Sequence, residues 1–231
     1  PNKLNVFPGV PPTEIPFNIE KAKLLQTRLS QLVKVEPLDP NSVETVAALD
    51  VGYRGSTGVG VAVAYSVKER RELCHTAVVA EVHIPYIPGL LAFREAPLMI
   101  AALKELESRC LEPDVLMVNG HGLAHPRKLG IASHIGVVLD KPSIGVAKKL
   151  LYGSVAEEQG RKILLVDGAK VGYVLETETG GKIYISVGHR ITPEDALAVT
   201  EKVWSRKQPL PDPLYIADHL TKQLRKKMET H

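Results

Sequence analysis

The sequence predicts an α/β fold in which helices flank one mixed sheet, part antiparallel and part parallel. Three apolar segments joined by short polar turns lie in the first half of the chain, and this order is typical of an antiparallel meander. Short apolar segments then alternate with segments of helical spacing, which is typical of parallel strands joined by helical crossovers. No apolar run approaches the roughly 18 residues of a membrane-spanning helix.

The first segments are a lead-in and a helix. Residues 1–17 are rich in proline, and we expect them to be irregular. Asn18 is a candidate N-cap, and a helix is expected from there to about Val33. The apolar residues that carry the helical spacing are Ala22, Leu25, Leu29 and Leu32. Pro37 and Pro40 mark its end.

The meander and a second helix follow. The three expected strands are 45–53, 59–67 and 77–84, with a charged turn at 68–72. A turn with proline at both ends, residues 85–88, leads to an expected helix at 94–110.

The second half of the chain begins with a crossover unit. Its expected elements are a strand at 115–118, a helix at 129–139 and a strand at 143–147. Asp167-Gly168 is a hairpin signal between strands at 163–166 and 171–176. One more strand and two helices are expected, at 182–187, 192–204 and 212–227. This order of elements is that of a ribonuclease-H-like fold, and the absence of repeats and long linkers favours a single domain over residues 1–231.

Three carboxylates stand among apolar neighbours. Asp50 interrupts the first strand, Glu95 begins a helix and Asp218 lies within the last helix. Taken singly, each has an ordinary interpretation: a turn cap, a first-turn acid that favours the helix dipole, and an exposed helix residue. If the three converge in space, their hard oxygen ligands select Mg²⁺ or Mn²⁺ over zinc.

The stretch 114–130 is an apolar strand that ends in a polar, glycine-rich turn, where α/β sheets place their sites. Its glycines allow a ligand to approach the backbone closely, although turn geometry alone also favours glycine. His121 and His125 have HxxxH spacing, but Gly122 and Pro126 disfavour a helix across them, so we do not expect a zinc site. Lys148, at a strand end, could meet a phosphate or could be surface charge.

The remaining composition sets broad limits. The net charge of +3 permits nucleic-acid binding without requiring it. Cys74 and Cys110 form no CxxC pair, so we expect neither a structural disulfide nor a zinc cage, and a reducing compartment fits. The turn at 85–88 carries an aromatic and an aliphatic tip that could wedge into a base stack, or could simply cap the core.

Four longer stretches occur in order, at 85–95, 120–134, 145–148 and 186–190. Together they resemble the endonuclease V family of deoxyinosine 3′ endonucleases, over roughly residues 18–228. The resemblance implies a ribonuclease-H-like DNA repair enzyme that uses Mg²⁺, or Mn²⁺, to cleave the second phosphodiester bond 3′ to a hypoxanthine nucleotide. Inosine in RNA is a further candidate substrate. A cytoplasmic monomer is expected, with no membrane partner.

The resemblance also implies roles for individual residues. It places Asp50, Glu95, Asn119 and Asp218 at the metal, and Asp50, Glu95, Asn119 and Lys148 at the catalytic site. The strand-separating wedge would be Pro85, Tyr86, Ile87 and Pro88. The pocket for the flipped base would be lined by Leu91, Gly120, Gly122, His125, Gly130, Ile131 and Leu151.

Asn119 departs from the family pattern, which has Asp-Gly-x-Gly at this position. Asn keeps the shape of Asp but neutralises less metal charge, so we expect inosine binding with weakened cleavage. An engineered Asp→Asn change that traps a substrate complex is the preferred explanation, and a natural variant is the alternative. Two other functions stay open: an inosine-binding protein without turnover, and a different ribonuclease-H-like nuclease acting on RNA or unmodified junctions.

Overall fold

A long antiparallel meander forms one half of the sheet in the computed structural model of the protein, which describes residues 5–6 and 16–228. The meander strands are β2 (Thr45–Arg54), β3 (Thr57–Ser66) and β4 (Arg71–Glu81). Two strands then run parallel to β2, namely β5 (Val115–Asn119) and β6 (Ser143–Ala147). The prediction of a meander followed by parallel strands is confirmed.

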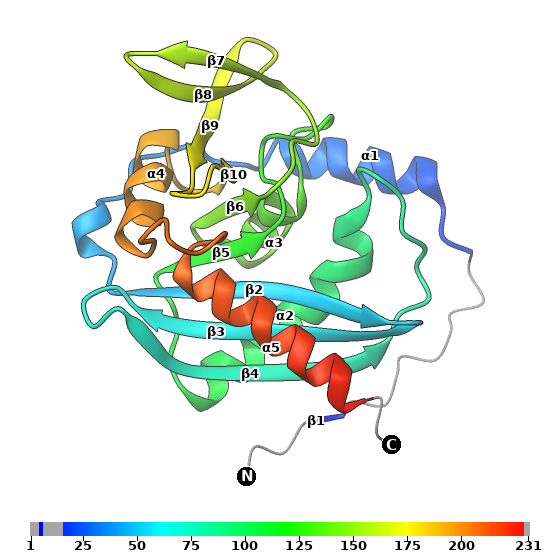
Figure 1. Ribbon diagram of the computed structural model, residues 1–231. Helices are drawn as coiled ribbons and strands as arrows, with labels where there is room; N and C mark the ends of the chain where they lie inside the picture. Colours follow the sequence, from blue (N-terminus) through cyan, green and yellow to red (C-terminus); the bar gives the residue numbers. More distant parts are fainter. Residues whose placement is uncertain (1–4, 7–15, 229–231) are drawn as a thin grey trace.

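The other half of the sheet is antiparallel. Its strands are β7 (Ser154–Glu158), β8 (Arg161–Val166), β9 (Ala169–Glu176) and β10 (Lys182–His189). With the two-residue β1 (Asn5–Val6), the described residues form one ten-stranded sheet in the order β1-β4-β3-β2-β5-β6-β10-β9-β8-β7. The hairpin of β7 and β8 projects from one end of this sheet (Figure 1).

Helices cover both faces of the sheet. The helices α2 (Leu91–Arg109) and α3 (Ile131–Leu139) pack on one face, and α1 (Ile19–Ser30) contacts α3. The helices α4 (Pro193–Lys202) and α5 (Asp212–Lys227) pack on the other face, where α5 lies across β2 and β3 (Figure 1). A short 3₁₀ helix, Pro40–Ser42, precedes β2. None of the helices in the described part of the chain is both long and apolar enough to cross a bilayer.

The alternation of side chains along β2 shows why this strand is apolar throughout. Val46 and Ala48 belong to the core on the α5 side, whereas Ala47 and Leu49 belong to the core on the α2 side. Successive strand residues point to opposite faces, so a strand covered on both faces must be apolar at every position. Asp50 follows in the same alternation as Val46 and Ala48, which directs it to the α5 side.

Several element boundaries correct the sequence predictions. The third strand begins at Arg71 rather than at residue 77, and the second helix begins at Leu91 rather than at residue 94. The expected irregular lead-in contains β1, which pairs with β4, while residues 7–15 lie outside the described part of the chain. β7 was not predicted, because its residues are mostly exposed and lack an apolar alternation. The hairpin at Asp167-Gly168 is confirmed, with φ of 51° and 78°.

A disulfide joins Cys74 on β4 to Cys110 at the C-cap of α2, with an S–S distance of 2.03 Å. The expectation that these cysteines form no structural disulfide is therefore wrong. They are 36 residues apart and carry no spacing signal; only the return of α2 along the sheet brings them together. The disulfide also removes the cysteine-based argument for a reducing compartment.

Candidate active site

The ends of β2 and β5 place Asp50 beside Asn119. The two strands are parallel, and Leu49 pairs with Val118, so the next residue of each strand is a neighbour of the other. The Asn119 side-chain amide donates a hydrogen bond from Nδ2 to Oδ1 of Asp50 at 3.1 Å. Asp50 is only 6% exposed, and its Oδ1 also accepts from the Val51 N–H at 2.8 Å. The amide of Asn119 thus occupies the side of Asp50 that faces the glycine-rich turn.

Two other carboxylates lie within electrostatic range of Asp50. Burial raises the pKa of Asp50 to about 7, and the charge of Asp218 on α5 adds to this rise. Burial likewise raises the pKa of Glu95, in the first turns of α2, to about 8, and the charge of Asp50 adds to it. Helices on opposite faces of the sheet therefore bring Glu95 and Asp218 to the strand that carries Asp50.

Asp50, Glu95 and Asp218 form an acidic group whose side chains are not yet oriented toward a common point. Lys222, one turn further along α5, places Nζ 2.6 Å from Oδ2 of Asp218. Within residues 5–6 and 16–228, no three Asp, Glu, His or Cys side chains are close enough to hold an ion together as they stand. Asn119 can supply a fourth oxygen, its Oδ1, if its amide rotates. The four residues could hold a hard divalent cation after side-chain adjustment, because all of their ligand atoms would be oxygen.

Lys148 lies at the same carboxyl end of the parallel strands. Asn119 pairs with Val146 of β6, and Lys148 lies two residues beyond Val146, immediately after the strand ends. Its side chain is exposed. The structure therefore places Lys148 and the acidic group at the carboxyl ends of neighbouring parallel strands.

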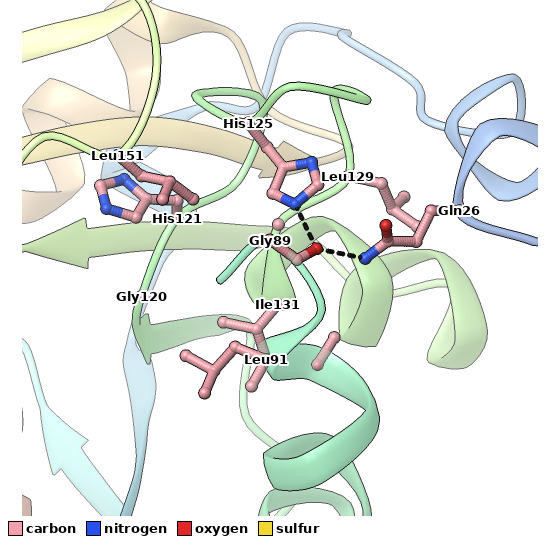
Figure 2. A pocket seen from close by; sticks show the side chains of 11 residues that line it. Gln26, Gly89, Leu91, Gly120, His121, His125, Leu129, Ile131 and Leu151 are labelled. Carbon is pink, nitrogen blue, oxygen red and sulfur yellow. Dashed lines mark hydrogen bonds between the residues drawn. The ribbon is translucent and has the colours of Figure 1, made fainter. Parts of the chain in front are cut away.

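A pocket opens at the turn that follows Asn119, and the next residue, Gly120, is part of its lining (Figure 2). It encloses about 320 Å³, part of it open to solvent. Six of the seven residues expected around a base line it: Leu91, Gly120, His125, Gly130, Ile131 and Leu151. The lining residues that the sequence reasoning missed are Gln26, Gly89, Ala92, His121 and Leu129.

Gly122 is the expected pocket residue that does not line the cavity. Its N–H donates to Oγ of Ser186 at 2.8 Å, and a Cβ at this position would lie 1.9 Å from the carbonyl oxygen of Val187. Gly122 therefore lets the turn after β5 pack directly on the backbone of β10. This close packing leaves no room for a side chain, so no other residue type fits there.

His125 has a defined tautomer. The Arg127 backbone N–H donates to its Nδ1 at 3.1 Å, so Nε2 carries the proton and donates to the Gly89 carbonyl oxygen at 2.8 Å. Burial lowers the pKa of His125 to about 4, which keeps the ring neutral near pH 7. A neutral ring in the pocket wall contributes shape and one hydrogen bond rather than charge.

The turn at 85–88 projects beside the pocket. Tyr86 at its tip is 67% exposed. Ile84, just before the turn, accepts a hydrogen bond at its carbonyl oxygen from Nη1 of Arg94 at 2.5 Å. The Arg94 guanidinium also stacks 4.2 Å from the centre of the Tyr53 ring. An exposed aromatic tip on an anchored turn has the form of a wedge.

A sequence signal existed for one of the missed residues. Gln26 follows Ala22 by four positions and so lies on the buried face of α1, where it is only 1% exposed. A polar residue on an apolar helix face needs a buried partner. His121 stood out through its HxxxH spacing with His125, but that spacing pointed to a metal and not to a pocket wall. Gly89, Ala92 and Leu129 are ordinary turn and helix residues and carried no such signal.

The comparisons with known proteins agree on one family. The family model for Endonuclease V matches residues 27–219. The chain is 44% identical over 211 residues to Endonuclease V of Desulfurococcus amylolyticus, which spans 89% of this chain and 95% of the relative. It is 43% identical over 216 residues to Endonuclease V of Thermus thermophilus, spanning 90% of this chain and 93% of the relative.

Solved structures give the same result. The Endonuclease V structure from Streptomyces avermitilis has a TM-score of 0.85 and 32% identity, covering 97% of this chain and all of that one. A Ciona intestinalis Endonuclease V, 24% identical with a TM-score of 0.80 over 91% of this chain and 98% of that one, was solved with a 24-mer DNA containing an inosine followed by a ribo-adenosine. From the family model and these relatives, the chain belongs to the endonuclease V family of nucleases.

Proposed function

We propose that this protein recognises a hypoxanthine nucleotide in DNA, with inosine in RNA as a further substrate, and hydrolyses the second phosphodiester bond 3′ to it in DNA repair. One observation carries the proposal: a single turn borders both the acidic group and the pocket. Asn119 touches Asp50, while the following Gly120 and the later Gly130 and Ile131 line the pocket. The inosine-containing DNA in the Ciona intestinalis complex supports the substrate class.

The acidic residues fit a divalent metal ion. Burial holds the pKa values of Asp50 and Glu95 well above the ordinary carboxyl range. The charge of Asp218 adds to the rise at Asp50, the charge of Asp50 adds to the rise at Glu95, and a nearby cation would relieve both costs. Asp50, Glu95, Asn119 and Asp218 would hold Mg²⁺ or Mn²⁺ through oxygen atoms. The bound ion would supply an activated water and stabilisation of the leaving 3′ oxygen.

The protein's own groups would bind and orient the strand. Lys148, exposed just after the end of β6, would contact a phosphate near the scissile bond. The pocket would take the extruded base, and the backbone at Gly120 and Gly130 would approach its edge without side-chain obstruction. Tyr86 would occupy the space that the base leaves in the stack. Hypoxanthine pairs weakly, so extruding it costs at most a few kcal/mol.

Asn119 is expected to slow turnover. Its amide donates to Asp50, whereas an Asp at this position would add a negative charge. We expect the chain to bind inosine-containing strands and to cleave them slowly. Asn119 lies on the acidic side of the turn, so its effect on base recognition should be small.

The test compares the parent chain with Asn119→Asp on inosine-containing DNA, inosine-containing RNA and unmodified duplexes in Mg²⁺. Asn41→Asp, the same substitution at an exposed position of the 3₁₀ helix, is the matched control. Faster nicking of inosine strands by Asn119→Asp alone supports the proposal, and equal rates for all three proteins would refute the role of Asn119. Tight inosine binding without nicking by any variant would instead favour a binding protein without turnover. Cleavage of the unmodified duplexes at the same rate would favour a different nuclease.

A further inference from the structure

The turn at 85–88 is anchored on both sides by side chains that hydrogen bond to backbone carbonyls. Arg94 holds the Ile84 carbonyl before the turn. The Gly89 carbonyl after the turn accepts from three donors: Gln26 Nε2 at 2.9 Å, His125 Nε2 at 2.8 Å and Arg127 Nη2 at 3.0 Å. Figure 2 shows the Gly89 oxygen between the Gln26 amide and the His125 ring.

The second anchor is a closed network. Arg127 also donates from Nε to Oε1 of Gln26 at 2.6 Å, so both polar atoms of the Gln26 amide have partners. Gln26 is 1% exposed and His125 is 2% exposed, so water cannot readily replace these bonds. Hydrogen bonds that share buried members hold those members in one arrangement.

Gly89 is suited to this position by its backbone and by its lack of a side chain. Its φ is +79°, in the left-handed region that glycine adopts without strain. A Cβ here would lie 3.0 Å from Nη2 of Arg127. Gly89 immediately follows the turn, and both it and Gln26 line the pocket. The network therefore links α1, the exposed turn and the pocket wall at one oxygen atom.

We propose that Gln26 and Arg127 are positioning residues that fix the 85–88 turn relative to the pocket, so that separation of a base pair and capture of the base occur in register. The proposal rests on the proposed function. The turn is useful only where a partner strand must be displaced. A single strand presents its bases already unpaired, so it gains little from a fixed turn.

The experiment measures binding rather than cleavage, because the parent chain is expected to cleave slowly. Parent, Gln26→Leu and Arg127→Lys are titrated against a fluorescent strand with one inosine, single-stranded and paired with its complement. The leucine keeps approximate volume and loses both amide hydrogen bonds. The lysine keeps the charge but lacks the guanidinium fork, whose two nitrogens bond Gln26 and Gly89 separately. We expect both variants to lose about tenfold in duplex affinity and less than about twofold in single-strand affinity. A 2-aminopurine beside the inosine should show weaker unstacking in the duplex.

Thr200→Val is the matched control for loss of a buried hydrogen bond. Thr200, on α4, is fully buried and donates to the Ala196 carbonyl at 2.8 Å, remote from the pocket lining. This variant should leave the ratio of duplex to single-strand affinity unchanged. If Gln26→Leu does not fold, as judged by thermal melting, Arg127→Lys decides the question.

Equal losses on both substrates, or an unchanged ratio in folded variants, would overturn the positioning role while leaving the proposed function intact. A parent chain that binds inosine strands no better than matched adenine strands would overturn the proposed function itself, and the positioning role with it. The two failures are therefore distinguishable in one set of titrations.

Discussion

Removal of the Cys74–Cys110 disulfide should lower stability without altering the candidate site. The bond closes a loop between residues 36 apart. The chain-entropy relation gives about 4 kcal/mol at 25 °C for a loop of that length. This is a large part of the roughly 5–15 kcal/mol typical of a folded domain. The melting temperature should fall by roughly 8–16 °C for a chain of this size.

The assay is urea unfolding with and without reductant, beside the Cys74→Ala/Cys110→Ala variant. The variant should resemble the reduced parent and should not respond to reductant. Inosine-strand binding at 25 °C should not change, because Glu95 lies about 22 Å from the disulfide along α2, at about 1.5 Å per residue. Cys110 is exposed, so a mild reductant can reach the bond.

Thiol titration decides whether the reasoning holds. Two free thiols in the unreduced, unfolded protein would show that the bond does not form. An unfolding midpoint that is the same with and without reductant would show that the loop-closure argument fails, even if the bond forms.

Three further outcomes are expected. The folded pKa values of Asp50 and Glu95, about 7 and about 8, lie above their ordinary values of 3.8 and 4.5. Their contribution to stability is therefore fully present below about pH 4 and is lost as pH rises through 7 to 8. In the presence of a chelator, chemical unfolding should show that stability falls over this pH range less steeply in Asp50→Asn than in the parent chain. The Mn²⁺ affinity measured by calorimetry should rise over the same range, because the ligands must ionise to bind the ion. A pH-independent Mn²⁺ affinity would contradict this. Gly122→Ala should lower stability by at least about 1–3 kcal/mol, because its Cβ would meet the Val187 carbonyl at 1.9 Å. Gly181→Ala should cost less, because its Cβ would approach only the Thr177 side chain, at 3.1 Å; equal melting temperatures would refute the packing argument. Asp114→Ala should cost about 1 kcal/mol in urea unfolding with unchanged inosine binding, since Asp114 Oδ2 accepts from the backbone N–H groups of Glu44 and Thr45 at 2.8 and 2.9 Å.

Much of the fold was predictable because its signals are local. The strands at 45–53 and 143–147 are apolar at nearly every position, as strands covered on both faces must be. Asn18 and Thr192 have the side chains that cap helices, and both accept the expected backbone hydrogen bonds. β7 was missed because an exposed edge strand has no buried face to impose a pattern.

The site could be predicted only in part. The resemblance placed six residues that line the pocket, whereas Gln26 and Gly89 entered it through long-range hydrogen bonds between segments 63 positions apart. Gly122 shows the opposite case: it was predicted to line the pocket, but it packs against β10 instead and lies outside the pocket lining.

The sequence by itself determined the order of the strands and helices other than β1 and β7, the family resemblance and the departure at Asn119, because these follow from local patterning and from residue identity. Only the tertiary structure decided that Cys74 meets Cys110, that Glu95 and Asp218 approach Asp50 from opposite faces of the sheet, and that Gln26 reaches Gly89. Each of these joins residues far apart along the chain. Such contacts arise from the packing of whole helices on the sheet, which no local pattern specifies.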